Sequence, residues 1–292
     1  MSDALQGLLD LLDLEAIEVN IFRGGHTDEK RMRTFGGLVA SQALVAAGRT
    51  VEPTKLVHSL HAYFLRPGAP QSPILYQVDR IRDGRSFSTR RVVAIQHGEV
   101  IFNLSASFHV NEPGVEHQAT MPKSVDPETL PTFAERYANY AEKLKTEEQR
   151  DWFTRPRPID LRHVAASPRE TNREPREPRQ QIWFRPDGDL PDDPLVHACV
   201  VAYASDMSLL DSILLPHTLS WDDGSMTGAS LDHAMWFHRP FSANQWLLYD
   251  QESTASYGAR GIARGEIWTS DGELIVSVVQ EGLVRETKAR RA

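Results

Sequence analysis

The sequence predicts an α+β fold made of two copies of one unit, each a helix wrapped by an antiparallel sheet. Two polar and aromatic strand-like segments end in Arg-Pro, at Arg66-Pro67 and Arg239-Pro240, and a strand hairpin of similar length follows each. The turn glycines Gly98 and Gly272 repeat at an offset of 174 residues, against 173 for the Arg-Pro pairs. Duplication explains these offsets better than chance. A polar residue present in only one copy is then a candidate for chemistry.

The composition is that of a soluble globular protein of 292 residues, with 40% hydrophobic and 25% charged residues. The net charge of −8 argues against a nucleic-acid partner, and no apolar stretch is long enough for a membrane span. Residues 1–14 predict a short amphipathic helix rather than a signal peptide. The single Cys199 excludes an intrachain disulfide and a multi-cysteine zinc site. We expect a cytoplasmic protein with no metal and no cofactor.

The first copy is expected within 1–112, after the leading helix. Residues 35–48, FGGLVASQALVAAG, place apolar residues at helical spacing, and their small size indicates a helix packed closely against its neighbours. Strand signals follow at 57–67, 74–84 and 86–110, with turns at Arg82-Asp83-Gly84 and His97-Gly98. The pattern predicts one helix followed by an antiparallel meander.

The segment 113–192 is expected to connect the copies, because it is rich in proline and polar residues. It predicts a charged helix at 131–149 and a strand around Gln181–Phe184.

The second copy is expected at 193–292. Asp193-Pro194 supplies an N-cap followed by a first-turn proline, and an apolar helix is predicted at 195–215. Strand signals follow at 230–240, 246–258, 259–272 and 273–285. A helix followed by four or five antiparallel strands is the layout of the hotdog fold, so the chain is predicted to be a double hotdog.

Three polar residues of the second copy stand out. Asp206 is predicted well inside the apolar helix, where a carboxylate needs a polar partner unless it faces solvent on the outer side of the helix. Ser230 begins the repeated strand, where its hydroxyl either caps a turn or points inward. Gln280 shares a strand face with Val276 and Val278, so it needs a partner if that face is buried, or reaches water if its strand lies at an edge.

Two weaker features complete the candidates. Gly36 and Gly37 open the first helix and offer backbone N–H groups that can polarise a carbonyl. His233 and His238 lie among aromatic residues and are interpreted as packed strand histidines rather than metal ligands.

Several motifs together closely resemble the type II acyl-CoA thioesterases, over both halves but not over 113–194. The matching segments are Phe35-Gly-Gly-x-x-x-x-Gln-Ala-Leu44, Tyr63-Phe-Leu-Arg-Pro-Gly68, Arg82-Asp-Gly-Arg-Ser-Phe87, Ser205-Asp206, Asp232-His-Ala-Met-Trp-Phe-His-Arg-Pro240 and Val279-Gln-Glu-Gly282. The resemblance implies a double hotdog that hydrolyses acyl-CoA with an Asp, a Ser or Thr, and a Gln. By motif these are Asp206, Ser230 and Gln280. It also implies a homodimer or homotetramer.

The reaction expected from these residues is direct hydrolysis. Asp206 accepts a proton from a water that Ser230 and Gln280 position, and a helix N-terminal N–H group, at Gly36 or Gly37, stabilises the oxyanion. One alternative makes Asp206 a nucleophile that forms an anhydride. A second alternative is a non-catalytic acyl-CoA binding protein. A third is a hotdog enoyl-CoA hydratase, and this enzyme would need a helix histidine such as His197.

Overall fold

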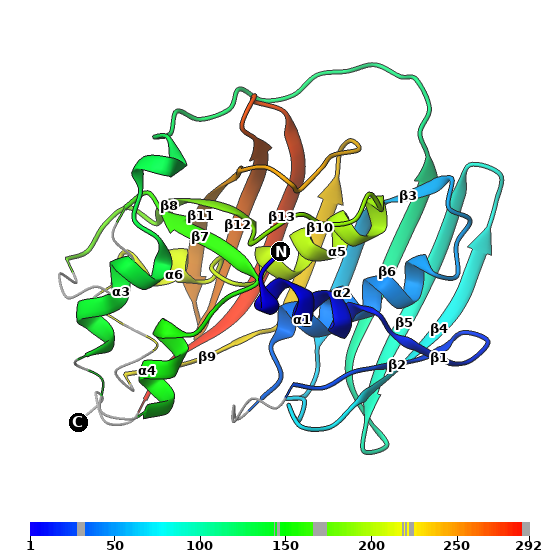
Figure 1. Cartoon of the computed structure of the whole chain (residues 1–292), viewed down its shortest axis with the longest axis horizontal. Helices are drawn as coiled ribbons and strands as arrows, with labels where there is room; N and C mark the ends of the chain where they lie inside the picture. The colour runs from blue at the N-terminus through cyan, green and yellow to red at the C-terminus, as the bar shows by residue number, and fades with distance from the viewer. Residues whose placement is uncertain are drawn as a thin grey trace.

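The computed structural model describes residues 1–27, 33–142, 144, 147–165, 174–217, 219, 221 and 225–287. Its main feature is one antiparallel sheet of 13 strands, with α2 (Gly36–Gly48) and α5 (Pro194–Ser205) side by side against one face (Figure 1). Each unit is thus a helix wrapped by its half of the sheet. The predicted double hotdog is confirmed.

The first unit contains α1 (Asp3–Leu12), α2 and the strands at one end of the sheet. The amphipathic helix predicted for the start of the chain is α1, and Ser2 caps it by accepting a hydrogen bond from the Leu5 N–H at 3.2 Å. The strands are β1 (Glu15–Glu18), β2 (Ile21–Gly24), β3 (Lys55–Phe64), β4 (Ile74–Asp83), β5 (Phe87–Gln96) and β6 (Glu99–Val110).

The second unit contains α5 and the strands at the other end. These are β7 (Ile159–His163), β8 (Arg179–Pro186), β9 (Met226–Ser230), β10 (Asp232–Phe237), β11 (Leu247–Tyr257), β12 (Arg260–Thr269) and β13 (Leu274–Glu286). The remaining helices are η1 (Pro127–Thr129), α3 (Phe133–Ala141) and α4 (Glu147–Thr154) before β7, and α6 (Asp211–Leu214) after α5.

The strand order has the same pattern from both edges. It runs β1-β2-β4-β5-β6-β3-β10-β13-β12-β11-β8-β7, and the two halves meet at β3 and β10. In this order β7 and β8 occupy the places of β1 and β2, although both lie within 113–192. That segment therefore supplies two strands of the second unit in addition to connecting the units.

The pairing of β3 with β10 defines a twofold axis between the units. Leu60 pairs with Met235, and Ala62 pairs with His233. An offset of 173 residues carries Leu60 to His233 and Ala62 to Met235, so it exchanges the two pairs. Residues of β3 therefore have defined counterparts in β10.

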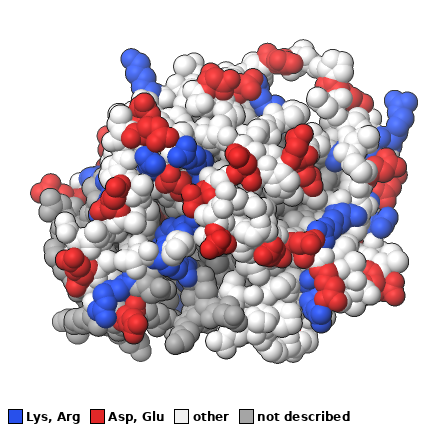
Figure 2. All heavy atoms as spheres, in the orientation of Figure 1, with Lys and Arg blue, Asp and Glu red and all other residues white. Residues whose placement is uncertain are grey.

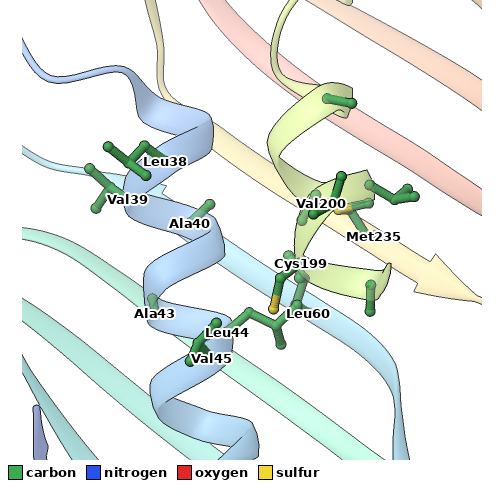
Figure 3. Packing of buried hydrophobic residues seen from close by; sticks show 14 of the residues in the cluster. Leu38, Val39, Ala40, Ala43, Leu44, Val45, Leu60, Cys199, Val200 and Met235 are labelled. Atoms are coloured by element: carbon green, nitrogen blue, oxygen red, sulfur yellow. The ribbon is translucent and has the colours of Figure 1, made fainter. Parts of the chain in front are cut away.

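The core depends on a close approach of α2 and α5, which run antiparallel. A Cβ atom on Gly37 would lie 2.7 Å from the Tyr203 carbonyl oxygen, and one on Gly48 would lie 2.6 Å from the Leu195 side chain. Figure 3 shows small side chains such as Ala43 of α2 and Cys199 of α5 in the layer that packs with Leu60 and Met235. The small residues of both helices permit this spacing.

The helix α5 is shorter than predicted, and this changes the position of Asp206. It ends at Ser205, residues 206–210 form turns, and helix resumes only at Asp211. Asp206 is the C-cap residue, with its N–H bonded to the Ala204 carbonyl. The prediction that Asp206 lies well inside the helix is wrong, because the helix ends one residue before it. At this helix end the carboxylate has polar partners, whereas inside the helix its neighbours would be apolar.

Lys and Arg residues are interspersed with Asp and Glu residues on the face shown in Figure 2. Among the described residues, none of the helices is long and apolar enough to cross a membrane.

The helix contact predicts opposite effects for two glycine substitutions. Gly37→Ala should lower the free energy of unfolding by about 1–3 kcal/mol, because its Cβ would press against a backbone carbonyl. Gly7→Ala in α1 is the matched control; its Cβ would meet nothing within 4 Å, and it should raise that energy by up to about 1 kcal/mol. Urea unfolding of both variants measures this. Equal effects of the two changes would contradict the assigned helix contact.

Candidate active site

Asp206 lies between the ends of both central helices. It follows the last residue of α5, and its carboxylate interacts with the Gly37 N–H at the start of α2. A Cβ atom on Gly36 would lie 2.8 Å from Asp206 Oδ2. The N-cap residue of α2, Phe35, has an apolar side chain that cannot cap the helix. Asp206 therefore caps α2 from the other unit, where the helix dipole favours an anion.

Two donors from the second unit converge on one oxygen of this carboxylate. Gln280 Nε2 donates to Asp206 Oδ1 at 2.6 Å, and Ser230 Oγ donates to the same oxygen at 3.3 Å. Gln280 is fully buried on β13, whereas Asp206 and Ser230 are partly exposed. The structure thus brings together the three residues that the sequence nominated, with two of them accessible from outside.

A one-residue register shift turns Ser230 toward this site. β10 pairs Ala234 with Val279 across β13, whereas β9 pairs Ser230 with Gly282. Continued without a shift, the β10 register would place Ser230 opposite Leu283, on the other face of the sheet from Gln280. The extra residue between β9 and β10 acts as a bulge and moves the Ser230 hydroxyl to the Gln280 face.

The environment of Asp206 holds its pKa near the middle of the pH scale. Burial raises the pKa of Asp206 to about 6, against the lowering effects of Gln280, Ser230, the Gly37 N–H and the charge of Arg33. The C-terminal end of α5 also disfavours the anion. A carboxylate with a pKa near 6 is still ionised at neutral pH and is a stronger base than an ordinary aspartate.

Sequence reasoning missed Arg33. Its Nη2 donates to the Gly228 carbonyl at 2.7 Å, which ties the segment before α2 to β9, the strand that ends in Ser230. Arginine just before a glycine-rich helix start carries no pattern that distinguishes it from an ordinary surface residue.

The opposite end of the helix pair lacks this chemistry. Aligning α2 with α5 through Leu38 and Leu195 places Arg49 at the position of Asp206, and the strand offset places Val57 at the position of Ser230. Arg49 donates to the Leu14 carbonyl and to Asp13, both at 2.6 Å. A cavity of about 400 Å³ lies here, and Arg49 and Val57 are among its lining residues.

The histidine required by the hydratase alternative lies far from Asp206 along α5. His197 is in the first turn of α5, and its Nδ1 accepts a hydrogen bond from the Ala243 N–H at 3.0 Å. It therefore lies at the opposite end of α5 from Asp206. Across the described ranges, no group of three or more His, Cys, Asp or Glu side chains is arranged to hold a metal ion.

Comparisons with known proteins identify the family of the chain. The family model described as acyl-CoA thioesterase matches residues 154–283, and the one described as acyl-CoA thioesterase N-terminal domain matches residues 26–109. The chain is 41% identical over 286 residues to acyl-CoA thioesterase 2 of Haemophilus influenzae, covering 98% of this chain and 99% of that protein. It is 40% identical to human acyl-coenzyme A thioesterase 8, covering 94% of this chain and 88% of that protein.

The chain is also similar to a solved structure of an acyl-CoA thioesterase. The crystal structure of an acyl-CoA thioesterase II from Mycobacterium marinum superposes with a TM-score of 0.77 at 43% identity, covering 97% of this chain and 98% of that one.

The raised pKa of Asp206 predicts a pH-dependent stability cost. The folded-state pKa of about 6 exceeds the ordinary value of 3.8, so the folded protein binds more protons between these values and loses stability as pH rises through that range. Asp206→Asn stays neutral. The free energy of unfolding of Asp206→Asn minus that of the wild type should therefore increase by about 1–3 kcal/mol from pH 4 to pH 7.5. The upper end of this range is discounted because Asp206 is partly exposed. Urea unfolding at both pH values measures this, and a pH-independent difference would contradict the raised pKa.

Proposed function

Because this chain belongs to the acyl-CoA thioesterase family and is an acyl-CoA thioester hydrolase, we propose that Asp206, Ser230 and Gln280 carry out the hydrolysis. The observation that supports this proposal best is the convergence of Ser230 and Gln280 on one oxygen of Asp206. The arrangement lies at the N-terminal end of α2, where polar N–H groups and a partly exposed surface meet. The fold alone does not require these polar groups, since the twofold-related end lacks them.

In the proposed reaction Asp206 is the general base. Gln280 and Ser230 hold Oδ1, which fixes the carboxylate plane and leaves Oδ2, on the side of Gly36, to accept a proton from water. The water attacks the thioester carbonyl and the acyl–sulfur bond breaks. The thiolate of CoA leaves and takes up a proton, so that the products are a carboxylic acid and CoA. Because a thiolate is a good leaving group, a positioned water suffices without a covalent intermediate.

The N-terminal end of α2 would stabilise the oxyanion. The N–H groups of Leu38 and Val39 both donate to the Phe35 carbonyl, at 3.2 and 3.3 Å, so the helix's own ladder begins after Gly36 and Gly37. The Gly37 N–H faces the Asp206 carboxylate. We therefore assign the Gly36 N–H to the thioester oxygen. A glycine here allows the carbonyl to approach the backbone closely.

Substitution of the three residues should separate catalysis from folding. Asp206→Asn should lower kcat by about 100- to 10,000-fold, as expected for loss of a general base. Gln280→Leu and Ser230→Ala should lower it by about 10- to 100-fold with little change in KM, since each positions the base or the water. Released CoA is measured with a thiol reagent across a panel of acyl-CoA substrates.

Asp232→Asn is the matched control. Asp232 is another partly buried acid whose pKa is raised by burial, and Asn can still accept the hydrogen bond from the Glu281 N–H at 2.6 Å. It should retain wild-type turnover. Full activity of Asp206→Asn, or an equal loss in Asp232→Asn, would remove Asp206 from the mechanism.

The activity should depend on the ionisation of Asp206. We expect kcat/KM to fall below about pH 6, because the carboxylate with a pKa of about 6 becomes protonated and cannot accept a proton. Steady-state rates from pH 4.5 to 8.5 measure this limb. The residual activity of Asp206→Asn should lack it. A limb that persists in the variant would assign the titration to another group.

The anhydride alternative is tested by a single turnover in ¹⁸O-labelled water. Direct attack places the label in the released acid during the first turnover, whereas a route through the carboxylate of Asp206 with attack at that carboxylate delivers unlabelled oxygen to the product first. A labelled acyl group trapped on the protein would also favour the anhydride.

A further inference from the structure

A second buried polar pair adjoins the site, formed by Ser205 and His233. Both residues are fully buried, Ser205 as the last residue of α5 and His233 on β10. His233 Nε2 lies 2.8 Å from Ser205 Oγ. The Ser205 hydroxyl also lies 2.9 Å from the Ala202 carbonyl oxygen and 3.6 Å from the Met235 sulfur. Because Ser205 directly precedes Asp206, this pair connects the end of α5 to the sheet beside the catalytic carboxylate.

The other nitrogen of His233 faces Gln280. The register that pairs Ala234 with Val279 places His233 and Gln280 at the next cross-strand position, on the same buried face. His233 Nδ1 and Gln280 Oε1 are both buried without a hydrogen-bond partner within the geometric limits, among the residues that the structure describes. Burial lowers the pKa of His233 to about 4, and its interaction with Gln280 opposes that shift. The imidazole is therefore neutral and carries one N–H at neutral pH.

The position of that proton follows from the two partners. If Nε2 carried it, the lone pair of Nδ1 would face the carbonyl oxygen of Gln280, which would place two buried acceptors against each other. If Nδ1 carries it, the N–H points to Gln280 Oε1, and the Ser205 hydroxyl donates to Nε2 rather than to the Ala202 carbonyl. Only the second arrangement gives each of these facing atoms a complementary partner.

We infer that His233 is a positioning residue that holds the Gln280 amide in its productive orientation. With Oε1 held by the Nδ1 proton of His233, the amide nitrogen is directed at Asp206 Oδ1, 2.6 Å away. A flipped amide would instead place a carbonyl oxygen against the carboxylate. This inference rests on the proposed function and identifies a residue that acts through Gln280 without contact to the substrate.

The internal duplication supports this role. The counterparts of His233 and Gln280 in the first unit are Leu60 and Ala106, which form a cross-strand pair and are both buried. The same position in the same sheet is therefore packed with two apolar residues in one unit and with two polar residues in the other. Packing does not demand a histidine here. The exchange of both members together indicates that His233 and Gln280 serve one purpose.

The test replaces His233 by the residue of its counterpart. His233→Leu should lower kcat by about 10-fold or more, the size of effect typical for loss of a group that orients a functional ligand, with KM nearly unchanged. It should also move the acid limb of the kcat/KM profile to higher pH, because Asp206 loses a well-placed N–H donor. His233→Asn restores an amide N–H near the position of Nδ1 and should recover most of both effects.

Met235→Leu is the matched control. Met235 lies on the same strand and the same buried face and also contacts Ser205, but it is two residues further from Gln280 along the strand. It should leave kcat and the pH profile unchanged. If it reproduces the His233→Leu phenotype, the effect comes from packing, and the inference is overturned.

A double substitution distinguishes this inference from the proposed function. In a Gln280→Leu background, His233→Leu should cause no further loss, because His233 acts through Gln280. Full losses from both changes in the double variant, or normal kinetics of His233→Leu beside an impaired Gln280→Leu, would overturn the inference and leave the proposed function standing. Normal activity of Gln280→Leu itself would overturn both.

A direct measurement needs no variant. ¹⁵N–¹H correlation spectra of histidine-labelled protein at neutral pH should show His233, assigned by its loss in His233→Asn, as the neutral tautomer protonated at Nδ1. Protonation at Nε2 would overturn the assignment.

Discussion

The site depends on the contact between the carboxylate of Asp206 and the N-terminal end of α2. The carboxylate follows the C-terminal end of its own helix, where the dipole disfavours an anion, and it is stabilised by the positive end of a helix from the other unit. A helix of one unit can stabilise the carboxylate of the other in this way only because α2 and α5 run antiparallel and touch at Gly37 and Tyr203. The small residues of both helices are therefore a requirement of the site as well as of the core.

The same sheet supports two ends with opposite chemistry. At one end β9, β10 and β13 supply a hydroxyl, an imidazole and an amide; at the other, the corresponding strand positions hold Val57, Leu60 and Ala106. The backbone arrangement is equivalent at both ends, as the symmetric strand order shows. Both ends also carry a one-residue register shift, between Val57 and Ser59 in β3 and between β9 and β10. The difference between the ends is therefore set by side chains, whereas the fold itself is set by the apolar positions that the units share.

The sequence alone was sufficient for the fold class, since the repeated Arg-Pro strands revealed the duplication. The motif resemblance also selected, among the asymmetric residues, three that the structure brings into contact. The sequence was not sufficient for the geometry. The end of α5 at Ser205 depends on a tertiary contact to α2, which outweighs the local apolar pattern that continues to Leu215. The bulge before β10 has no glycine or proline signature at Leu231. His233 was taken as a packed histidine because an exact register between the copies is needed to see that its counterpart is Leu60.

The asymmetry between the ends follows from the cost of an incomplete site. A carboxylate at position 49 without donors at positions 57 and 106 would bury a poorly paired charge, and a glutamine at 106 without a partner for its carbonyl would leave an orphaned buried acceptor. Each group is tolerated only when the others are present, so a second site would require several simultaneous changes of side chain. Arg49 instead bonds outward to Asp13 and the Leu14 carbonyl. The charge at the second end is thereby paired without the polar groups that surround Asp206, and in the proposed mechanism the cost of burying a reactive carboxylate falls on one end only.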